Sequence, residues 1–269
     1  MVCVLVGFIW KKCKVPYDTD MVSRLVMCVG APCLVVSAMT GAAVSRSVIE
    51  EMFGVTLVMI MATLLLAAIV IALARQPLRA YLGPLVFPNA GNMGLPVCMF
   101  AFGEKGLVLA IAVFMMLSLV HFTLGIALVS GRSVFQEMVR NPIIYSICAA
   151  LVMIYGDISL PKWGQNTVAL LGDMTIPLML ITLGVSLANM QVNQLGKSAV
   201  FAVARLTIGV TVGWGVATGF GLSGVATGFG LSGVAKGVVI LQSAMPVAVF
   251  NYLFAVRYGR EPQVVAGMV

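Results

Sequence analysis

The chain alternates long apolar segments with short polar stretches, and most of these segments approach the ~20 residues that a membrane-spanning helix needs. This pattern predicts an all-α polytopic membrane bundle. The predicted segments lie at about 1–10, 21–43, 53–74, 80–103, 106–130, 141–156, 166–189, 198 onward and 236–256. The first is only about half a span long, and a tenth begins at VVAGMV, where the sequence ends. We therefore expect a chain that begins within its first helix and has a missing or truncated tenth helix.

The fourth segment is interrupted between residues 86 and 103, which read VFPNAGNMGLPVCMFAFG. Pro96 removes a backbone donor, so a helix break or kink is expected near it. Glycines let the chain leave helical geometry there, and two asparagines supply amides beside the freed backbone groups. Within a membrane, such backbone persists only where it is buried in protein or lines a water-filled cavity. The stretch is therefore a candidate binding site.

Composition supports the membrane interpretation, because 61% of the 269 residues are hydrophobic, 9% are charged and the mean hydropathy is +1.09. Soluble domains carry about 25% charged residues. The net charge is +7. These basic residues lie in short loops, where membrane topology explains them better than a nucleic-acid partner does. Asp18 and Asp20 are candidate N-caps of the second segment.

Lysines and arginines are distributed unequally between the two sets of loops. Those after odd-numbered segments are Lys11, Lys12, Lys14, Arg75, Arg79, Arg132, Arg140, Lys197, Arg257 and Arg260. Those after even-numbered segments are Arg46, Lys105, Lys162 and Lys236. Because basic loops stay on the cytoplasmic side, this distribution predicts a multi-pass protein of the cytoplasmic membrane with its N-terminus outside.

Chemistry-bearing residues are few. The six cysteines form no CxxC pair and are most simply buried hydrophobes, and a single histidine leaves no metal cluster. We expect no cofactor and no metal. A membrane-embedded enzyme would need converging nucleophiles, bases or ligands, so catalysis is not predicted.

Prolines recur at corresponding places in the two halves of the chain. Pro32 and Pro177 lie in the second and seventh segments, and Pro96 and Pro246 in the fourth and ninth. Because five helices is an odd number, the second half would be inserted upside down. Paired interruptions of this kind indicate the substrate site of a secondary transporter. The predicted inverted repeats are residues 1–135 and 136–269.

The motifs NAGNMGLPV in the fourth segment and QSAMPVAVFNYLFAVRYG in the ninth resemble the two crossover motifs of the auxin efflux carrier family. That family includes plant auxin exporters and bacterial permeases for malate, malonate and similar anions, and the resemblance covers essentially the whole chain. A more distant resemblance is to bile acid sodium symporters. The resemblance to the auxin efflux carrier family implies two inverted five-helix repeats whose fourth and ninth helices break at prolines and cross in mid-membrane. It also implies transport of a small organic anion by alternating access, one bundle rocking against a scaffold.

A tandem duplication departs from the family pattern: GVATGFGLS at 215–223 recurs at 224–232. We expect the extra copy to form a glycine-rich loop between the eighth and ninth segments. Each copy holds a GxxxG spacing, which permits close helix contact. A slipped duplication without a role is favoured over a functional one. The two spacings are Gly215 with Gly219 and Gly224 with Gly228.

The candidate substrate-binding residues flank the two breaks and are Asn89, Gly91, Asn92, Gly94, Pro96, Gln242, Ser243, Pro246 and Asn251. Their amides, with the N–H groups of half-helix N-termini, can bind a carboxylate or its coupling ion. The alternative is that the amides only satisfy backbone groups that the prolines expose. Site membership is favoured most for the first two asparagines.

Asp173 and His121 are candidates for coupling to a proton or sodium ion, because intramembrane acids and histidines often mark ion paths. Asp173 is also explained as a solvated residue near its segment's outer end, and His121 as a hydrogen-bonded core residue. Arg205 either attracts an anion or extends to the cytoplasmic interface, and its place near a segment end favours the interface.

The function predicted is secondary transport of a small organic anion such as malate, malonate or an auxin-like carboxylate. The alternatives are a sodium-coupled symporter of bile acid-like anions and a truncated, non-transporting membrane protein. Sodium dependence of uptake would distinguish the sodium-coupled symporter from the predicted organic anion carrier. The expected partners are the anion, a coupling ion and the lipid bilayer, and a homodimer is compatible with the sequence.

Overall fold

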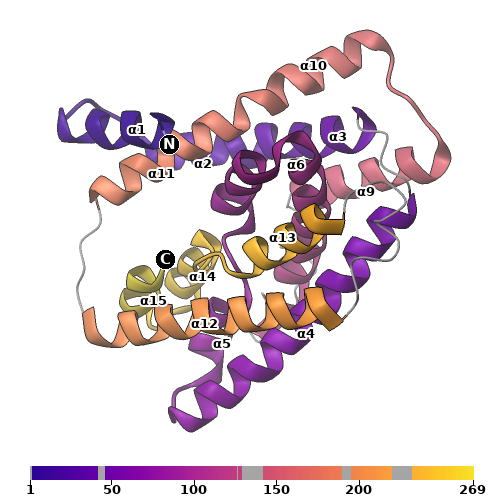
Figure 1. The fold of residues 1–269 in the computed structure, drawn as a ribbon. Helices are drawn as coiled ribbons and strands as arrows, with labels where there is room; N and C mark the ends of the chain where they lie inside the picture. The colour runs from indigo at the N-terminus through magenta and orange to yellow at the C-terminus, as the bar shows by residue number, and fades with distance from the viewer. Residues whose placement is uncertain (1, 42–45, 126, 129–141, 190–194, 220–231) are drawn as a thin grey trace. The chain divides into compact units, whose positions relative to one another are not determined.

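The computed structural model describes residues 2–41, 46–125, 127–128, 142–189, 195–219 and 232–269. Regular structure in these residues is helical, apart from an isolated antiparallel bridge between Pro88 and Val247 (Figure 1). The all-α prediction is therefore confirmed. Contacts divide the chain into two compact units. Unit 1 comprises Met1–Arg46 and Val139–Met190, and unit 2 comprises Ser47–Met138 and Gln191–Val269.

Each unit takes helices from both halves of the sequence. The helices of unit 1 are α1 (Val2–Lys12), α2 (Thr19–Leu25), the π-helix η1 (Val26–Gly30), α3 (Ala31–Gly41), α9 (Pro142–Gly156), α10 (Lys162–Asp173) and α11 (Thr175–Asn189). Those of unit 2 are α4 (Arg46–Leu73, starting at the boundary), α5 (Leu78–Val86), η2 (Ala90–Gly94), α6 (Leu95–Val120), η3 (His121–Gly125), α12 (Leu195–Gly219), α13 (Ser232–Ser243), α14 (Val249–Tyr258) and α15 (Pro262–Met268). The compact units are thus not the predicted halves 1–135 and 136–269, and the inverted repeat stays a prediction.

Several helical stretches of the described residues are long and apolar enough to cross a membrane. They are Met21–Met39, Arg46–Leu73, Ala90–Gly125, Lys162–Val185 and Gly196–Gly219. Shorter apolar helices are Pro142–Gly156 and Gly233–Ser243. These stretches confirm the polytopic membrane class that the hydrophobic pattern predicts.

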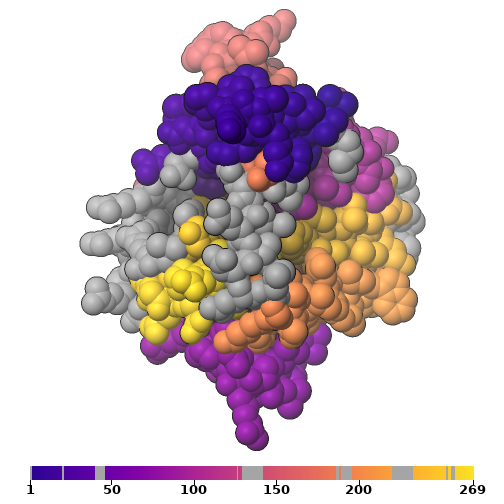
Figure 2. Space-filling view, turned by 90° about the vertical axis from the view of Figure 1, so that its left-hand side faces the viewer, coloured from indigo at the N-terminus to yellow at the C-terminus, as the bar shows by residue number. Residues whose placement is uncertain are grey.

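In unit 1, α1 and α11 lie side by side (Figure 1). A Cβ on Gly7 would overlap the backbone carbonyl of Ile181, and a Cβ on Gly184 would overlap that of Val4. Because each glycine faces the other helix's backbone, the two helices approach more closely than larger side chains permit. Helix α1, within the indigo surface of Figure 2, exposes apolar side chains that include Leu5, and the lysines Lys11 and Lys12 at its end.

The prolines of unit 1 follow the interruptions rather than occupy them. Pro32 lies in the first turn of α3, directly after η1, and Pro177 lies in the first turn of α11, after the turn at Met174. Both prolines lie within longer helical stretches, Met21–Met39 and Lys162–Val185, so each removes a backbone donor just after an irregular turn. The N-cap predicted at Asp18 is confirmed, because its carboxylate accepts a hydrogen bond from Met21 N at 2.9 Å. The side chain of Asp20, the other candidate, lies outside the described residues.

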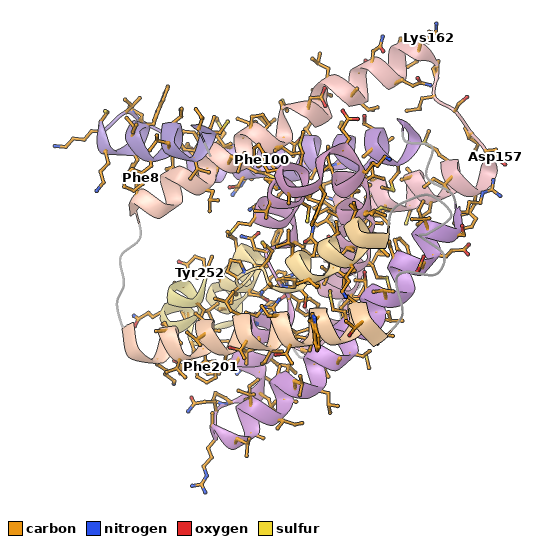
Figure 3. All side chains as sticks on the ribbon, viewed as in Figure 1. Phe8, Phe100, Asp157, Lys162, Phe201 and Tyr252 are labelled. Atoms are coloured by element: carbon orange, nitrogen blue, oxygen red, sulfur yellow. The ribbon has the colours of Figure 1, made fainter. Side chains whose placement is uncertain are left out.

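An ion pair joins Arg46 to Asp157, which Figure 3 labels beyond the end of α9. The Arg46 guanidinium also donates to the Ile154 carbonyl at 3.1 Å. Exposed pairs of this kind contribute at most about 1 kcal/mol. The contact bears on topology, because it joins the loop after the second predicted segment to the loop after the sixth.

In unit 2, α6 contains a kink at Gly103, whose φ of 66° and ψ of −159° are compatible only with glycine. This kink separates the fourth predicted segment from the fifth. Beyond it the helix is deeply buried, with Leu109, Ile111 and Met115 at 2% exposure or less. Helix α6 therefore supplies the core against which the two interrupted segments pack.

Helices α12 and α15 also pack closely in unit 2. The Ser198 hydroxyl donates to the Val264 carbonyl at 3.1 Å, and a Cβ on Gly267 would meet Ser198 Oγ at 2.5 Å. Helix α15 occupies the place of the tenth predicted segment, after left-handed backbone at Gly259 and Glu261.

Two regions discussed from the sequence lie wholly or partly outside the described residues. One is the loop at 129–141, and the other is 220–231, which includes most of the duplication. Of the predicted GxxxG contacts, only Gly215 and Gly219 can be assessed. Nothing lies within 4 Å of a Cβ built on either, so this pair makes no close helix contact with the described residues.

Candidate functional site

The first interruption lies between α5 and η2. Helix α5 ends at Val86, and residues 87–89 are not helical, with Phe87 at φ −97°, ψ 110°. Pro88 is at the centre of this break. The expectation that the break centres on Pro96 is wrong, because Pro96 is the second residue of α6, which continues directly from η2, whereas the non-helical residues are 87–89.

The second interruption lies between α13 and α14. Helix α13 ends at Ser243 and α14 begins at Val249, and residues 244–248 between them are not helical. Pro246 lies within this stretch, as predicted. The freed carbonyls and N–H groups of both breaks need partners, because unpaired backbone groups are costly in an apolar environment.

The two breaks satisfy each other. Asn89 N donates to the Pro246 carbonyl at 2.7 Å, and Ala248 N donates to the Phe87 carbonyl at 3.2 Å. These bonds flank the Pro88–Val247 bridge, as in an antiparallel pair. The exchange is reciprocal, with each break giving one N–H and one carbonyl. Two segments far apart in the sequence are thereby joined within unit 2.

The Gln242 carboxamide lies beside η2, the helix that follows the first break, without a hydrogen-bond partner among the described residues. Its side chain is fully buried, and both Oε1 and Nε2 are unpaired. It rests against Gly94, where a Cβ would overlap Oε1. A buried amide without partners costs about 1–3 kcal/mol, so this group is poised to bond a ligand or water.

His121 is linked to the first break through Asn251, which lies in the first turn of α14, just after the second break. Its Nε2 lies 3.1 Å from Asn251 Oδ1, and Asn251 Nδ2 donates to the Phe87 carbonyl at 3.2 Å. Both side chains are buried. The hydrogen-bonded core role weighed for His121 is therefore present, and it reaches the backbone of the crossover.

Aromatic rings surround His121. Its imidazole stacks on the Phe87 ring at a centroid distance of 4.1 Å with 10° between the planes, and Phe254 meets it edge-on at 5.6 Å. Phe122 and Phe250 complete the cluster, with ring centroids 5.0 Å apart. The crossover thus has an apolar, aromatic side around a single imidazole.

Arg205 lies on the buried face of α12 and does not extend to the interface. It is 1% exposed, and its Nη2 donates to the Ser243 carbonyl at 2.8 Å. Helix α12 begins at Leu195, so Arg205 lies about 15 Å along it, roughly half of a ~30 Å hydrocarbon core. The interface interpretation of Arg205 is therefore wrong, because the helix starts earlier than predicted and the side chain is enclosed.

The helices α12 and α13 cross at glycines one turn apart. A Cβ on Gly209 would overlap the Ser243 carbonyl, and a Cβ on Gly213 would lie 2.8 Å from Ser243 Cβ. Ser243 Oγ in turn donates to the Gly209 carbonyl at 2.7 Å. The close GxxxG contact of this segment is therefore Gly209 with Gly213, not the predicted pair six residues later.

The remaining candidates are distributed between the units. Asn89 is buried within the first break, Asn92 is half-buried in η2, and a Cβ on Gly91 would meet the Phe114 ring at 3.0 Å. Asp173 belongs to unit 1, where it is exposed at the end of α10. Within unit 2 the structure gathers the candidates that flank the two breaks with His121.

Comparison with known proteins agrees with the architecture. Residues 126–269, more than half of the chain, match a family model described as "Membrane transport protein". The chain belongs to this family. The auxin efflux carrier resemblance is confirmed by a curated relative, auxin efflux carrier component 7 of Arabidopsis thaliana, which is 29% identical over 140 residues. The match covers 49% of this chain and 21% of the relative, so this chain's match spans about a fifth of that protein's length.

Two contributors to the site in this membrane transport protein were missed or misjudged from sequence. Pro88 was not singled out, although it lies at the centre of the break in the FPN stretch. Arg205 lies four residues after Phe201, which Figure 3 labels on α12, and four before Gly209. This i, i+4 spacing places all three on one face, and that apolar face indicated burial.

Proposed function

We propose that this chain moves a small organic anion across the cytoplasmic membrane by alternating access, with the paired breaks of unit 2 as its substrate site. The observation that carries the proposal is the reciprocal hydrogen bonding between Phe87–Asn89 and Pro246–Ala248. Substrate sites of secondary transporters form at such interrupted helices. Membership of a membrane transport family is in accord with it.

The chemistry of the crossover suits an anion that is bound and released unchanged. The N-terminal turns of η2 and α14 present N–H groups and the positive ends of helix dipoles. The buried Gln242 carboxamide offers a donor that no described residue occupies. Asn89 and Asn92 add amides on the other break. Binding through such groups needs no covalent step, in keeping with a carrier rather than an enzyme.

Ion coupling in this proposal is assigned to His121. The imidazole is enclosed in the aromatic cluster and bonded to Asn251, which bonds the Phe87 carbonyl in the break. A proton gained or lost there changes the hydrogen bond that supports the crossover backbone. Asp173 stays a candidate on sequence grounds, and its exposed position is also that of a solvated residue.

Uptake by the purified full chain in liposomes tests the proposal. Labelled malate, malonate and indole acetate are offered separately, with a proton gradient, with a sodium gradient and with neither. We expect at least one anion to accumulate, and Gln242→Leu and Asn92→Ala to lower its uptake while leaving membrane insertion intact. Gly54→Ala is the control, since nothing lies within 4 Å of a Cβ at that exposed site of α4.

Two outcomes would redirect the proposal. Uptake that requires sodium and favours a bile acid such as taurocholate would support the sodium-coupled symporter instead. A folded, inserted chain that moves none of the anions would show that the carrier interpretation is wrong for this chain.

A further inference from the structure

Arg205 is a buried cation at the middle of a membrane-spanning helix. Its side chain is 1% exposed and is among the largest fully buried side chains of the described residues. Charged groups at such depth are costly and occur chiefly where they pair with another group or serve a transport path. The position therefore calls for a partner.

The contacts of Arg205 leave much of its guanidinium unused. Nη2 donates to the Ser243 carbonyl, whereas Nε and Nη1 are buried with no hydrogen-bond partner among the described residues. Arginine has five N–H donors in a planar fork, so one bond to a carbonyl satisfies a small part of it. Nη1 lies near Gly209, at 3.1 Å from where a Cβ would be.

A counter-charge is also missing from the described part of the chain. The ion pair found there joins Arg46 to Asp157 in unit 1, and none involves Arg205. An ionised group buried without pairing is strongly unfavourable. A carboxylate held by the free donors would supply both the charge and the hydrogen bonds.

The anchor of Arg205 places this unused charge at the end of α13, where the second break begins. Ser243 is the last residue of α13, and the residue before it, Gln242, carries the carboxamide whose two polar atoms are also buried and unpaired. Two polar side chains with unpaired atoms therefore meet the last turn of α13: Gln242 is part of that turn, and Arg205 is bonded to its Ser243 carbonyl. Capping the α13 carbonyl alone would use one donor and explain neither set of unpaired atoms.

We infer that Arg205 supplies the positive charge of the substrate site, binding a carboxylate of the transported anion through the unpaired N–H groups of its guanidinium, with the Gln242 carboxamide as a second donor. The inference rests on the proposed function and deepens it, since it names the residue that selects an anion over a neutral solute. The bond to Ser243 holds the guanidinium in place, so the site is formed before the anion arrives.

Binding to the full chain in lipid nanodiscs tests this assignment. Labelled malonate and indole acetate are the probes, and malonamide and indole acetamide are their neutral competitors. The variants are Arg205→Lys and Arg205→Met, each with a thermal melt to verify folding. The matched control is Arg79→Met, which removes an exposed arginine from α5 in the same unit.

We expect Arg205→Met to weaken binding of the carboxylate by about 10- to 100-fold, the value of a lost charge-assisted bond. Arg205→Lys keeps the charge without the planar fork and should show a smaller loss. Preference for carboxylate over amide should fall in Arg205→Met and stay unchanged in Arg79→Met. A folded Arg205→Met protein that binds and prefers the anion as wild type does would overturn the assignment and leave the proposed function standing.

Two further outcomes decide the remaining cases. If wild type binds neither anion, the proposed function fails, and the assignment of Arg205 fails with it. If neither variant folds, wild type decides: a carboxylate preference of about tenfold or more supports the assignment, and equal affinity for acid and amide overturns it.

Discussion

The His121–Asn251 contact shows how single polar side chains hold the crossover. Asn251 uses its carbonyl oxygen for the imidazole and its N–H for the Phe87 carbonyl, so one residue bonds a side chain and a broken backbone together. The Phe87 carbonyl also accepts a hydrogen bond from Ala248 N, so both lone pairs of its oxygen are used. The network is buried, so each missing member leaves an unsatisfied partner.

Asn251→Ala should therefore lower the free energy of unfolding by about 1–3 kcal/mol, since it leaves the buried His121 Nε2 without its partner and removes one of the two bonds to the Phe87 carbonyl. A double-mutant cycle with His121→Leu, measured by denaturation in detergent, should give a coupling energy of about 0.5–3 kcal/mol. Thr211→Ala is the control, because that hydroxyl is exposed and bonds only within its own helix. Strictly additive effects of the two substitutions would contradict a direct link.

Gly94 makes room for the Gln242 carboxamide. Gly94→Ala should displace that amide and weaken anion binding by about tenfold, while overpacking lowers stability by about 1–3 kcal/mol. Gly54→Ala adds the same methyl where nothing lies within 4 Å, and should be neutral or stabilising by up to about 1 kcal/mol. Equal anion affinity in wild type and Gly94→Ala, measured in nanodiscs, would separate Gln242 from the site.

At the scale of the helix, α12 offers a matched pair of glycines. Gly209 faces the Ser243 backbone, whereas Gly215 has open space around it. Gly209→Ala should force α12 and α13 apart, shift the Arg205 anchor and lower both the melting temperature and uptake. Gly215→Ala should leave both unchanged or slightly raised, because alanine favours helix by about 1 kcal/mol. Similar losses in both variants would mean that α12 needs its glycines for a reason other than this crossing.

The interrupted elements also show what sequence patterns can and cannot locate. Apolar periodicity and length identified the spanning segments, because burial in lipid imposes them on the sequence. The breaks were expected at Pro96 and Pro246. The second break does contain Pro246, whereas the first lies at Pro88 and Pro96 lies in the helix that follows it. A proline near the start of a helix and a proline in a break have the same local sequence signal. Which of the two opens the chain depends on the backbone hydrogen bonds that the stretch makes with the other break.

The reciprocal bonds also revise the correspondence between the two halves. In this exchange Phe87 and Pro246 play the same role, since each supplies the accepting carbonyl, and Asn89 and Ala248 each supply the donating N–H. The sequence motifs had instead aligned Pro96 with Pro246. Local composition favours aligning proline with proline. The exchanged hydrogen bonds follow from tertiary contact, which no local pattern encodes.

At the scale of the whole chain, topology is the property that the charge pattern predicts most directly. The Arg46–Asp157 pair joins the residues that follow the second and sixth segments, and the Lys and Arg distribution assigns both to the same, external face. The pairing within unit 1 is therefore compatible with the predicted orientation. It does not distinguish inside from outside.

Cysteine labelling measures that orientation. Cys13 is exposed in the chain between α1 and α2, which the charge pattern makes cytoplasmic. In a variant that retains only Cys13, an impermeant maleimide should react after the membrane is permeabilised and not before. In a second variant with Asp157→Cys as its only cysteine, the reagent should react with intact cells. The opposite pattern in both would place the N-terminus inside.

Both breaks belong to unit 2, which suggests that they move as one body during transport. Pro88 and Val247 form the non-hydrogen-bonded pair of their bridge, where Cα atoms are about 4.5 Å apart, within reach of a disulfide. In a background with the native cysteines replaced, Pro88→Cys with Val247→Cys should therefore cross-link on oxidation. Because the bond joins parts that already touch, oxidised and reduced proteins should take up the anion at similar rates in liposomes. Each single-cysteine variant controls for loss of the proline or valine. Uptake that stops on oxidation and returns on reduction would mean that the two breaks must separate during the cycle, and that the crossover is itself the moving gate.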